Sequence, residues 1–265
     1  MRGELMKQYN IKGYRIDCTQ PLLCAAIIGT SVEEVKAEIK RIEESDVEVV
    51  EWRIDLFLTH EPAYKLLEMS SYLYQELSDR ILLYTLRSQA EGGECGLSAQ
   101  EKAELLKELI SYHHADLIDL EDALLQTGNT ALLQKAHKQQ MKVIVSHHDF
   151  LQTPKREELC EKLLVMSKRG GDIVKLACMP QSHEDVLTLA QVGQWARKEL
   201  DCALIMISMG TLGMPARVFP TLFSSVLSFA GVSGSSAPGQ LSVQEMRSIW
   251  KSLQENEKKG VDEYV

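Results

Sequence analysis

The sequence lacks the features that mark several large classes of protein. Its 265 residues contain no run of five or six basic residues, and the net charge of −9 argues against a nucleic-acid-binding surface. No apolar stretch approaches the roughly 20 residues of a membrane-spanning helix. Residues 1–20 alternate between polar and apolar and contain no signal-peptide core. These absences predict a cytoplasmic protein with neither nucleic-acid nor membrane partners.

The cysteines and histidines are also not grouped in the ways that bind metals or form disulfides. The cysteines are scattered, with no close pair of the metal or redox type: Cys18, Cys24, Cys95, Cys160, Cys178 and Cys202. This spacing predicts reduced thiols. Two adjacent histidine pairs occur, His113-His114 and His147-His148, but no His-x-x-x-His. We therefore expect no metal site.

What the sequence does contain is a regular alternation of short apolar runs and amphipathic segments, repeated at intervals of roughly 25 to 35 residues. The predicted strands are 22–28, 47–54, 81–86, 117–120, 142–146, 173–177, 203–208 and 225–231. The clearest predicted helices are 32–44, 99–112, 156–168, 184–199 and 242–255. Ser31, Ser98 and Ser242 each precede a glutamate by three residues, as in a capping box, and Thr153-Pro154 marks another helix start.

Eight such strand–helix units predict a parallel (β/α)₈ barrel, and the chain length is close to the ~250 residues typical of that fold. An open doubly wound sheet is the alternative. Against it, the turn after the first strand, 28–31, contains a single glycine and no Gly-x-Gly-x-x-Gly. We expect one domain over 1–265, with an N-terminal extension of about 1–20 and a polar, frayed tail of about 256–265.

Lys175 lies in the middle of the apolar strand 173–177. Burial disfavours the charged ammonium form, and a neutral lysine amine can attack a carbonyl carbon to form a Schiff base. The alternative is an ordinary lysine that extends to water or pairs with an acid such as Asp172. Taken alone, Lys175 favours the ordinary interpretation.

Other unusual polar residues fall at the carboxyl ends of the predicted strands, which is where barrel enzymes carry their active sites. They are Glu51, Arg53 and Asp55, then Arg87, then Ser146 to Asp149, then Ser208 to Gly210, and last the small-residue loop 233–240. Each has an ordinary explanation: an ion pair between Glu51 and Arg53, a solvated arginine, a core histidine or a linker. Their common position favours one shared site.

These residue types suit imine chemistry on a small anionic keto acid. A protonated lysine imine acidifies the neighbouring C–H, and His148 is a suitable group to move the proton. Glu91 could orient that imidazole, and Arg53, Arg87 and Arg217 could bind a carboxylate.

The chain resembles the type I 3-dehydroquinate dehydratases along nearly its whole length. The matching segments are 51–55, Arg87 with 91–93, 146–150, 172–177, 208–210 and 236–240. The resemblance implies a (β/α)₈ barrel, a homodimer, that converts 3-dehydroquinate to 3-dehydroshikimate in the shikimate pathway without a cofactor.

The resemblance also implies residue roles. Lys175 would form the imine, His148 would transfer protons and Glu91 would orient His148. Arg217 would bind the substrate carboxylate, and Met209 would pack against the ring. The remaining implied substrate contacts are Glu51, Arg53, Arg87, Ser236, Ala237 and Gln240.

The sequence departs from the family pattern at Ala26, where some members have serine, at Ala216, where serine is frequent, and at His147, where asparagine is common. Because neighbouring strand residues face opposite sides, only one of His147 and His148 can face the barrel, and the Ser-x-His-Asp-Phe pattern indicates His148. Two rival functions stay open: a class I aldolase acting on a keto acid or sugar phosphate, and a non-catalytic binding protein.

Overall fold

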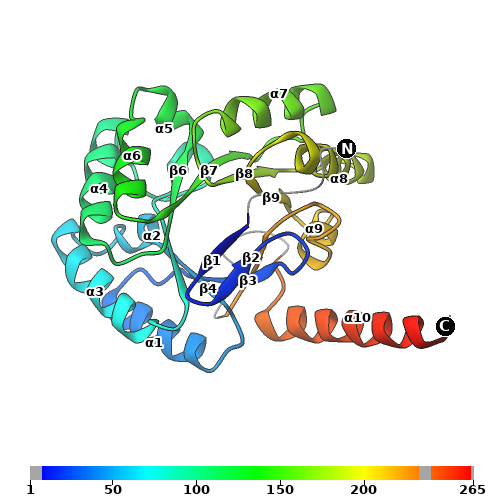
Figure 1. The fold of residues 1–265 in the computed structure, drawn as a ribbon. Helices are drawn as coiled ribbons and strands as arrows, with labels where there is room; N and C mark the ends of the chain where they lie inside the picture. Colours follow the sequence, from blue (N-terminus) through cyan, green and yellow to red (C-terminus); the bar gives the residue numbers. More distant parts are fainter. Residues whose placement is uncertain (1–7, 233–239, 264–265) are drawn as a thin grey trace.

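Eight of the strands in the described part of the chain form one parallel sheet that curls into a nearly closed barrel ringed by helices (Figure 1). The computed structural model describes residues 8–232 and 240–263, with side chains as far as Glu255. The strand order in the sheet is β10-β3-β4-β5-β6-β7-β8-β9, and every neighbouring pair is parallel. The predicted (β/α)₈ barrel is confirmed.

The sheet strands are short and buried on both faces, as parallel strands covered by helices must be. They are β3 Leu22–Ile27, β4 Val49–Arg53, β5 Ile81–Thr85, β6 Leu117–Glu121, β7 Lys142–Asp149, β8 Ile173–Cys178, β9 Ala203–Ser208 and β10 Leu227–Ala230. The α-helices are α1 Val32–Glu43, α2 Ile54–Phe57, α3 Leu66–Glu76, α4 Ala99–Tyr112, α5 Asp122–Gln126, α6 Ala131–Lys138, α7 Arg156–Ser167, α8 His183–Glu199, α9 Met214–Val218 and α10 Val243–Glu263. Two 3₁₀ turns are η1 Ala63–Lys65 and η2 Gln89–Glu91.

The two outer strands of the sheet, β9 and β10, are brought together by the residues just before β10. The backbone N–H of Val226 donates to the Leu204 carbonyl at 2.8 Å. The Ser225 hydroxyl oxygen accepts from the Met206 N–H at 2.8 Å and donates to the Met206 carbonyl at 3.1 Å. These bonds join the segment just before β10 to β9, so the sheet curves round onto itself.

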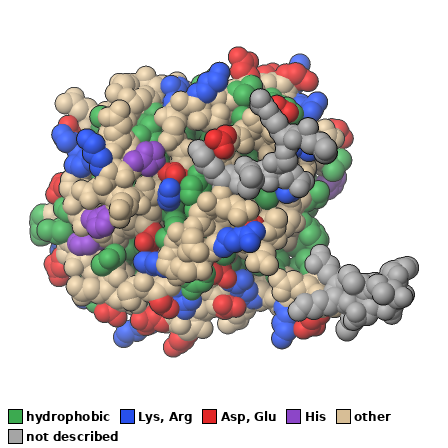
Figure 2. Space-filling view, viewed as in Figure 1, with side chains coloured by type: hydrophobic (Ala, Val, Ile, Leu, Met, Phe, Trp, Pro, Cys, Tyr) green, Lys and Arg blue, Asp and Glu red, His purple; other side chains and the backbone are tan. Residues whose placement is uncertain are grey.

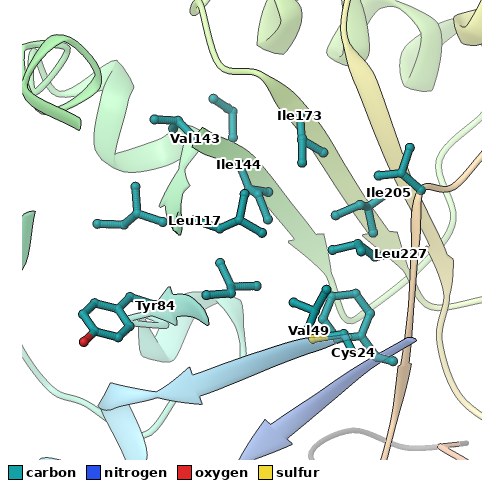
Figure 3. Close-up of a cluster of buried hydrophobic side chains, with 14 of the residues drawn as sticks. Cys24, Val49, Tyr84, Leu117, Val143, Ile144, Ile173, Ile205 and Leu227 are labelled. Carbon is teal, nitrogen blue, oxygen red and sulfur yellow. The ribbon is translucent and has the colours of Figure 1, made fainter. Parts of the chain in front are cut away.

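The alternation of side chains along the strands divides the inward-facing residues into an apolar and a polar set. Cys24 pairs with Val49, Leu83 with Leu117, and Ile173 with Ala203, so apolar side chains lie side by side on neighbouring strands. Cys24, Val49, Leu117 and Ile173 are labelled in Figure 3. Two residues closer to the carboxyl ends of their strands, the inward-facing residues are Glu51, Thr85, Asp119, Ser146 and Lys175. An apolar floor therefore lies beneath a polar layer at the carboxyl ends.

A hairpin that the sequence reading did not predict lies in the N-terminal extension. Strands β1 Tyr9–Ile11 and β2 Tyr14–Ile16 are antiparallel, and Lys12 and Gly13 between them both have positive φ, as a tight hairpin turn requires. The Tyr9 hydroxyl donates to the Asp172 carbonyl, just before β8, and Lys12 Nζ pairs with Asp116, just before β6. The hairpin thus covers the amino-terminal end of the barrel, opposite the polar layer.

Helix boundaries follow the predictions with two exceptions. Ser31, Ser98 and Ser242 all accept a hydrogen bond from the backbone N–H three residues on. The predicted cap at Thr153 is wrong, because α7 begins after Lys155 and has no side-chain cap. The last helix, α10, continues to Glu263, beyond the predicted end near residue 255.

Acidic and basic side chains are interspersed on the face shown in Figure 2. Across the described ranges 8–232 and 240–263, no helix is both long and apolar enough to cross a membrane. Within the same ranges no group of three or more His, Cys, Asp or Glu side chains could hold a metal ion.

Candidate active site

A cavity of about 190 Å³ opens at the carboxyl ends of the strands. Every predicted site residue in the described part of the chain lines it, and Ser236 and Ala237 lie outside that part. The full lining is Glu51, Arg53, Thr85, Arg87, Glu91, Gly92, His148, Phe150, Lys175, Ala177, Ile207, Met209, Arg217, Phe229 and Gln240. The strand ends therefore bring together residues that are as much as 189 positions apart, from Glu51 to Gln240.

Lys175 is buried, with only 4% of its surface exposed, and its side chain reaches the cavity from β8. Its Nζ lies 4.6 Å from the centre of the Phe229 ring and 4.0 Å from Asp119 Oδ2. Burial lowers the pKa of Lys175, and the nearby Glu51 and Asp119 carboxylates oppose this without reversing it. The burial excludes the alternative in which Lys175 extends to water. The lowered pKa increases the fraction of Lys175 that is a neutral amine near neutral pH.

His148 faces the cavity and is held by Glu91. Its Nδ1 lies 2.9 Å from Glu91 Oε2, and a carboxylate at that position accepts the Nδ1 proton and leaves Nε2 free as a base. Burial lowers the pKa of His148 well below its usual value, and the positive charges of Arg87 and Lys175 lower it further. The imidazole is therefore neutral at neutral pH. His147 does not line the cavity.

The turn that holds Glu91 depends on glycine. Gly92 has φ +81°, and a Cβ there would lie 2.4 Å from the Phe150 ring. Phe150 in turn stacks on His148, with 6.3 Å between the ring centres. Contact between this turn and the segment after β7 fixes the distance between carboxylate and imidazole.

Arg87 is the centre of a buried ion-pair network. Its guanidinium donates to Asp119 at 2.8 Å, to Ser146 at 2.9 Å and to Glu121 at 3.2 Å. Burial by itself would lower the pKa of Arg87, but the surrounding carboxylates outweigh it and raise the pKa above its ordinary value. Lys102 from α4 pairs with the other oxygen of Glu121 at 2.5 Å. Arg87 is thus a fixed positive charge at the cavity wall.

Arg53 and Glu51 do not form the ion pair that the sequence left open. Arg53 instead makes a two-pronged contact with Asp55, at 2.9 and 2.8 Å, and Glu51 accepts from the Thr85 hydroxyl at 2.7 Å. Asp55 is fully buried and also accepts from the Arg87 backbone N–H. Asp55 therefore fixes the position of the Arg53 side chain at the cavity, and Thr85 fixes that of Glu51.

Arg217 is different, because no described carboxylate lies within ion-pair distance of this buried cation. It is 4% exposed, and its Nε has no hydrogen-bond partner. Burial lowers the pKa of Arg217 to about 10, and no carboxylate contributes to the shift. An unpaired buried guanidinium beside a cavity is chemically suited to an incoming carboxylate.

Two acidic residues of the site were missed from the sequence. Asp119 and Glu121 lie at the carboxyl end of β6, a strand to which no site residue was assigned. Their period-of-two spacing at the end of an apolar run, Leu117–Glu121, is the same pattern that identified Glu51 and Arg53. Phe229, which lies against Lys175, carried no such pattern, since an aromatic in a buried strand is ordinary.

The fold and the cavity place the chain among (β/α)₈ barrels whose polar site, at the carboxyl ends of the strands, contains a buried lysine and an imidazole–carboxylate pair. Residues 23–257 match the family model described as Type I 3-dehydroquinase. The chain belongs to this family.

Individual relatives agree with that assignment. The chain is 34% identical over 252 residues to 3-dehydroquinate dehydratase of Geobacillus sp. (strain WCH70), covering 94% of this chain and 96% of the relative. It is 36% identical over 246 residues to that of Lactiplantibacillus plantarum, covering 93% and 98%. Among solved structures, the Clostridium difficile type I enzyme with covalently modified comenic acid has a TM-score of 0.89, 33% identity, and coverage of 95% and 99%. The Geobacillus kaustophilus enzyme also has a TM-score of 0.89, with 31% identity and coverage of 94% and 96%.

Proposed function

We propose that this protein is a 3-dehydroquinate dehydratase that removes water from 3-dehydroquinate to give 3-dehydroshikimate. The observation that carries the proposal is the buried Lys175 in one cavity with the Glu91–His148 pair and Arg217, whose Nε has no hydrogen-bond partner. An amine nucleophile, a base and an anion-binding group together match a keto acid that loses water next to its ketone. The proposal is in keeping with the activity named for the relatives.

The reaction begins with Lys175. Its neutral amine adds to the ring ketone, and loss of water gives an imine that is stabilised when protonated. The protonated imine draws electrons away from the adjacent carbon, so a C–H bond there becomes acidic. The charges of Glu51 and Asp119 lie near this nitrogen and offset the positive charge that forms on it.

His148 carries out the proton transfers. Its free Nε2 takes the acidic proton, the electron pair passes through an enamine, and the hydroxyl on the next carbon leaves as water with the proton that His148 returns. Water then hydrolyses the imine, which releases 3-dehydroshikimate and restores the Lys175 amine. Glu91 stabilises the imidazolium between these steps.

Substrate binding is divided between charge and shape. Arg217 receives the ring carboxylate, and Arg53 and Glu51, held by their own partners, contact hydroxyl groups. Met209, Ile207 and Phe229 form the apolar wall against the ring. Arg87 supplies a fixed positive charge while its hydrogen bonds remain with Asp119 and Ser146. We also include Gln240, and the predicted contacts Ser236 and Ala237, among the residues that bind the substrate.

We further propose that the protein acts in the shikimate pathway, in the cytoplasm and as a homodimer. The absence of any disulfide bond among the described cysteines is compatible with a reducing compartment. Light scattering of the purified protein across a concentration series tests the dimer directly. A monomer mass at every concentration would remove that part of the proposal.

Turnover of 3-dehydroquinate tests the function, because the product contains a carbon–carbon double bond conjugated to its ketone and absorbs ultraviolet light where the substrate does not. We expect wild type and Lys36→Met, altered on the exposed face of α1, to turn over equally, and Lys175→Met to be inactive. Turnover of sugar phosphates instead would favour the aldolase. Full activity in Lys175→Met would eliminate the imine mechanism.

A further inference from the structure

Glu91 lies between two histidines, only one of which reaches the cavity. Its Oε2 is 2.9 Å from His148 Nδ1, and its Oε1 is 3.6 Å from His147 Nδ1. His147 Nδ1 is buried and has no hydrogen-bond partner. Its side chain is 30% exposed, compared with 10% for His148. The second imidazole therefore contacts solvent on one side and the carboxylate that orients His148 on the other.

The other charged groups on the elements around His147, among the described residues, have partners of their own. Asp122 of α5 binds Lys162 of α7 and Arg169, which follows that helix. Glu121 of β6 binds Lys102 and Arg87, and Asp149 of β7 accepts from two backbone N–H groups of the next loop. The β8 residue that pairs with His147 is Leu176, which is uncharged. In the described part of the chain, the titratable and charged groups that face His147 are thus Glu91 and, beyond it, His148 and Arg87.

We propose that His147 is a positioning residue that acts on His148 through Glu91, and that a charge gained by His147 draws the shared carboxylate away from His148. A movement of Glu91 by less than 1 Å would bring Oε1 within hydrogen-bond distance of His147 Nδ1, as judged from the present 3.6 Å. The contacts of Glu91 with both histidines do not depend on a bound substrate. Its effect on turnover rests on the function proposed above.

The sign of the effect follows from the charges. A cation at position 147 weakens the Glu91–His148 bond and repels a proton on His148, so His148 gains its proton at a lower pH than it would alone. Removing the titratable group should therefore let His148 take up a proton at a higher pH. A permanent positive charge should have the opposite effect.

Histidine NMR on the free protein tests this without requiring any activity. With ring-labelled histidine, and the His148 signal identified by its loss in His148→Gln, we expect the His148 titration to move up by about 0.5 to 1 pH unit in His147→Asn. In His147→Lys it should move down. His113→Asn is the matched control, because His113 is exposed at the left-handed end of α4, where asparagine is well tolerated.

The pH profile of kcat/KM should show the same displacement of its acid limb, up in His147→Asn and down in His147→Lys. A His148 titration that is unchanged in both variants, or that moves in the same direction in both, would overturn the proposal. A displaced titration in a protein that does not turn over 3-dehydroquinate would instead keep this inference and reject the proposed function.

Discussion

Replacing Arg217 by methionine should stabilise the protein while it weakens substrate binding. Burial lowers the pKa of Arg217 from 12.5 to about 10, so folding disfavours its charged form. At pH 7 the guanidinium is charged in both the folded and the unfolded chain. The free energy needed to bury this charge therefore destabilises the folded state. At about 1.4 kcal/mol per pH unit this cost is about 3 kcal/mol, and methionine removes it while keeping part of the apolar stem.

We therefore expect the free energy of unfolding of Arg217→Met, measured in urea at pH 7 without ligand, to exceed that of wild type by roughly 1 to 3 kcal/mol. The KM for 3-dehydroquinate should rise roughly 10- to 150-fold, because charge-assisted hydrogen bonds to a carboxylate contribute about 1.5 to 3 kcal/mol.

Arg247→Met is the matched control. Arg247 lies on α10, away from the cavity, and already pairs with Glu48 at 2.5 Å. Its replacement should give no gain in stability and no change in KM. If Arg217→Met were instead less stable than wild type, Arg217 would have a structural partner, and the argument that it awaits a carboxylate would be refuted.

Three further predictions concern the reacting groups. His148→Ala should lower kcat by about 10²- to 10⁴-fold, while an imine still forms and can be trapped. A nearly normal rate in His148→Ala, together with an inactive His147→Ala, would show that His147 and not His148 transfers the protons. Gly92→Ala should reduce both kcat and stability, because its Cβ would lie 2.4 Å from Phe150 at φ +81°, and a normal melting temperature would contradict this. Because burial lowers the pKa of Lys175, the rate of imine formation should rise with pH and reach its plateau below pH 10.5. The fraction of neutral amine in an ordinary lysine would still be rising at that pH.

The fold was predictable because its strands are continuous apolar runs. A parallel strand that faces helices on one side and the barrel interior on the other needs apolar side chains throughout, and runs such as Leu22–Ile27 meet that need. The N-terminal hairpin was missed because its strands have three residues each, too few to show a periodicity. Its strongest local mark, Lys12-Gly13, is only one turn dipeptide.

The site was predictable where a polar residue interrupts an apolar strand, as with Lys175 and Glu51. Asp119 and Glu121 interrupt β6 in the same way and were overlooked. The partners of Arg87 could not be read from the sequence, because they depend on how β5, β6 and β7 align side by side. The proximity of both His147 and His148 to Glu91 is likewise a consequence of the η2 turn, which strand alternation alone does not describe.

Reductive trapping of the imine tests the central claim most directly. Sodium borohydride added during turnover of 3-dehydroquinate reduces the imine to a stable secondary amine, which peptide mass mapping can locate. The account predicts one modified lysine, Lys175, and loss of activity in proportion to the label. Continued product formation with no label on Lys175 would contradict it.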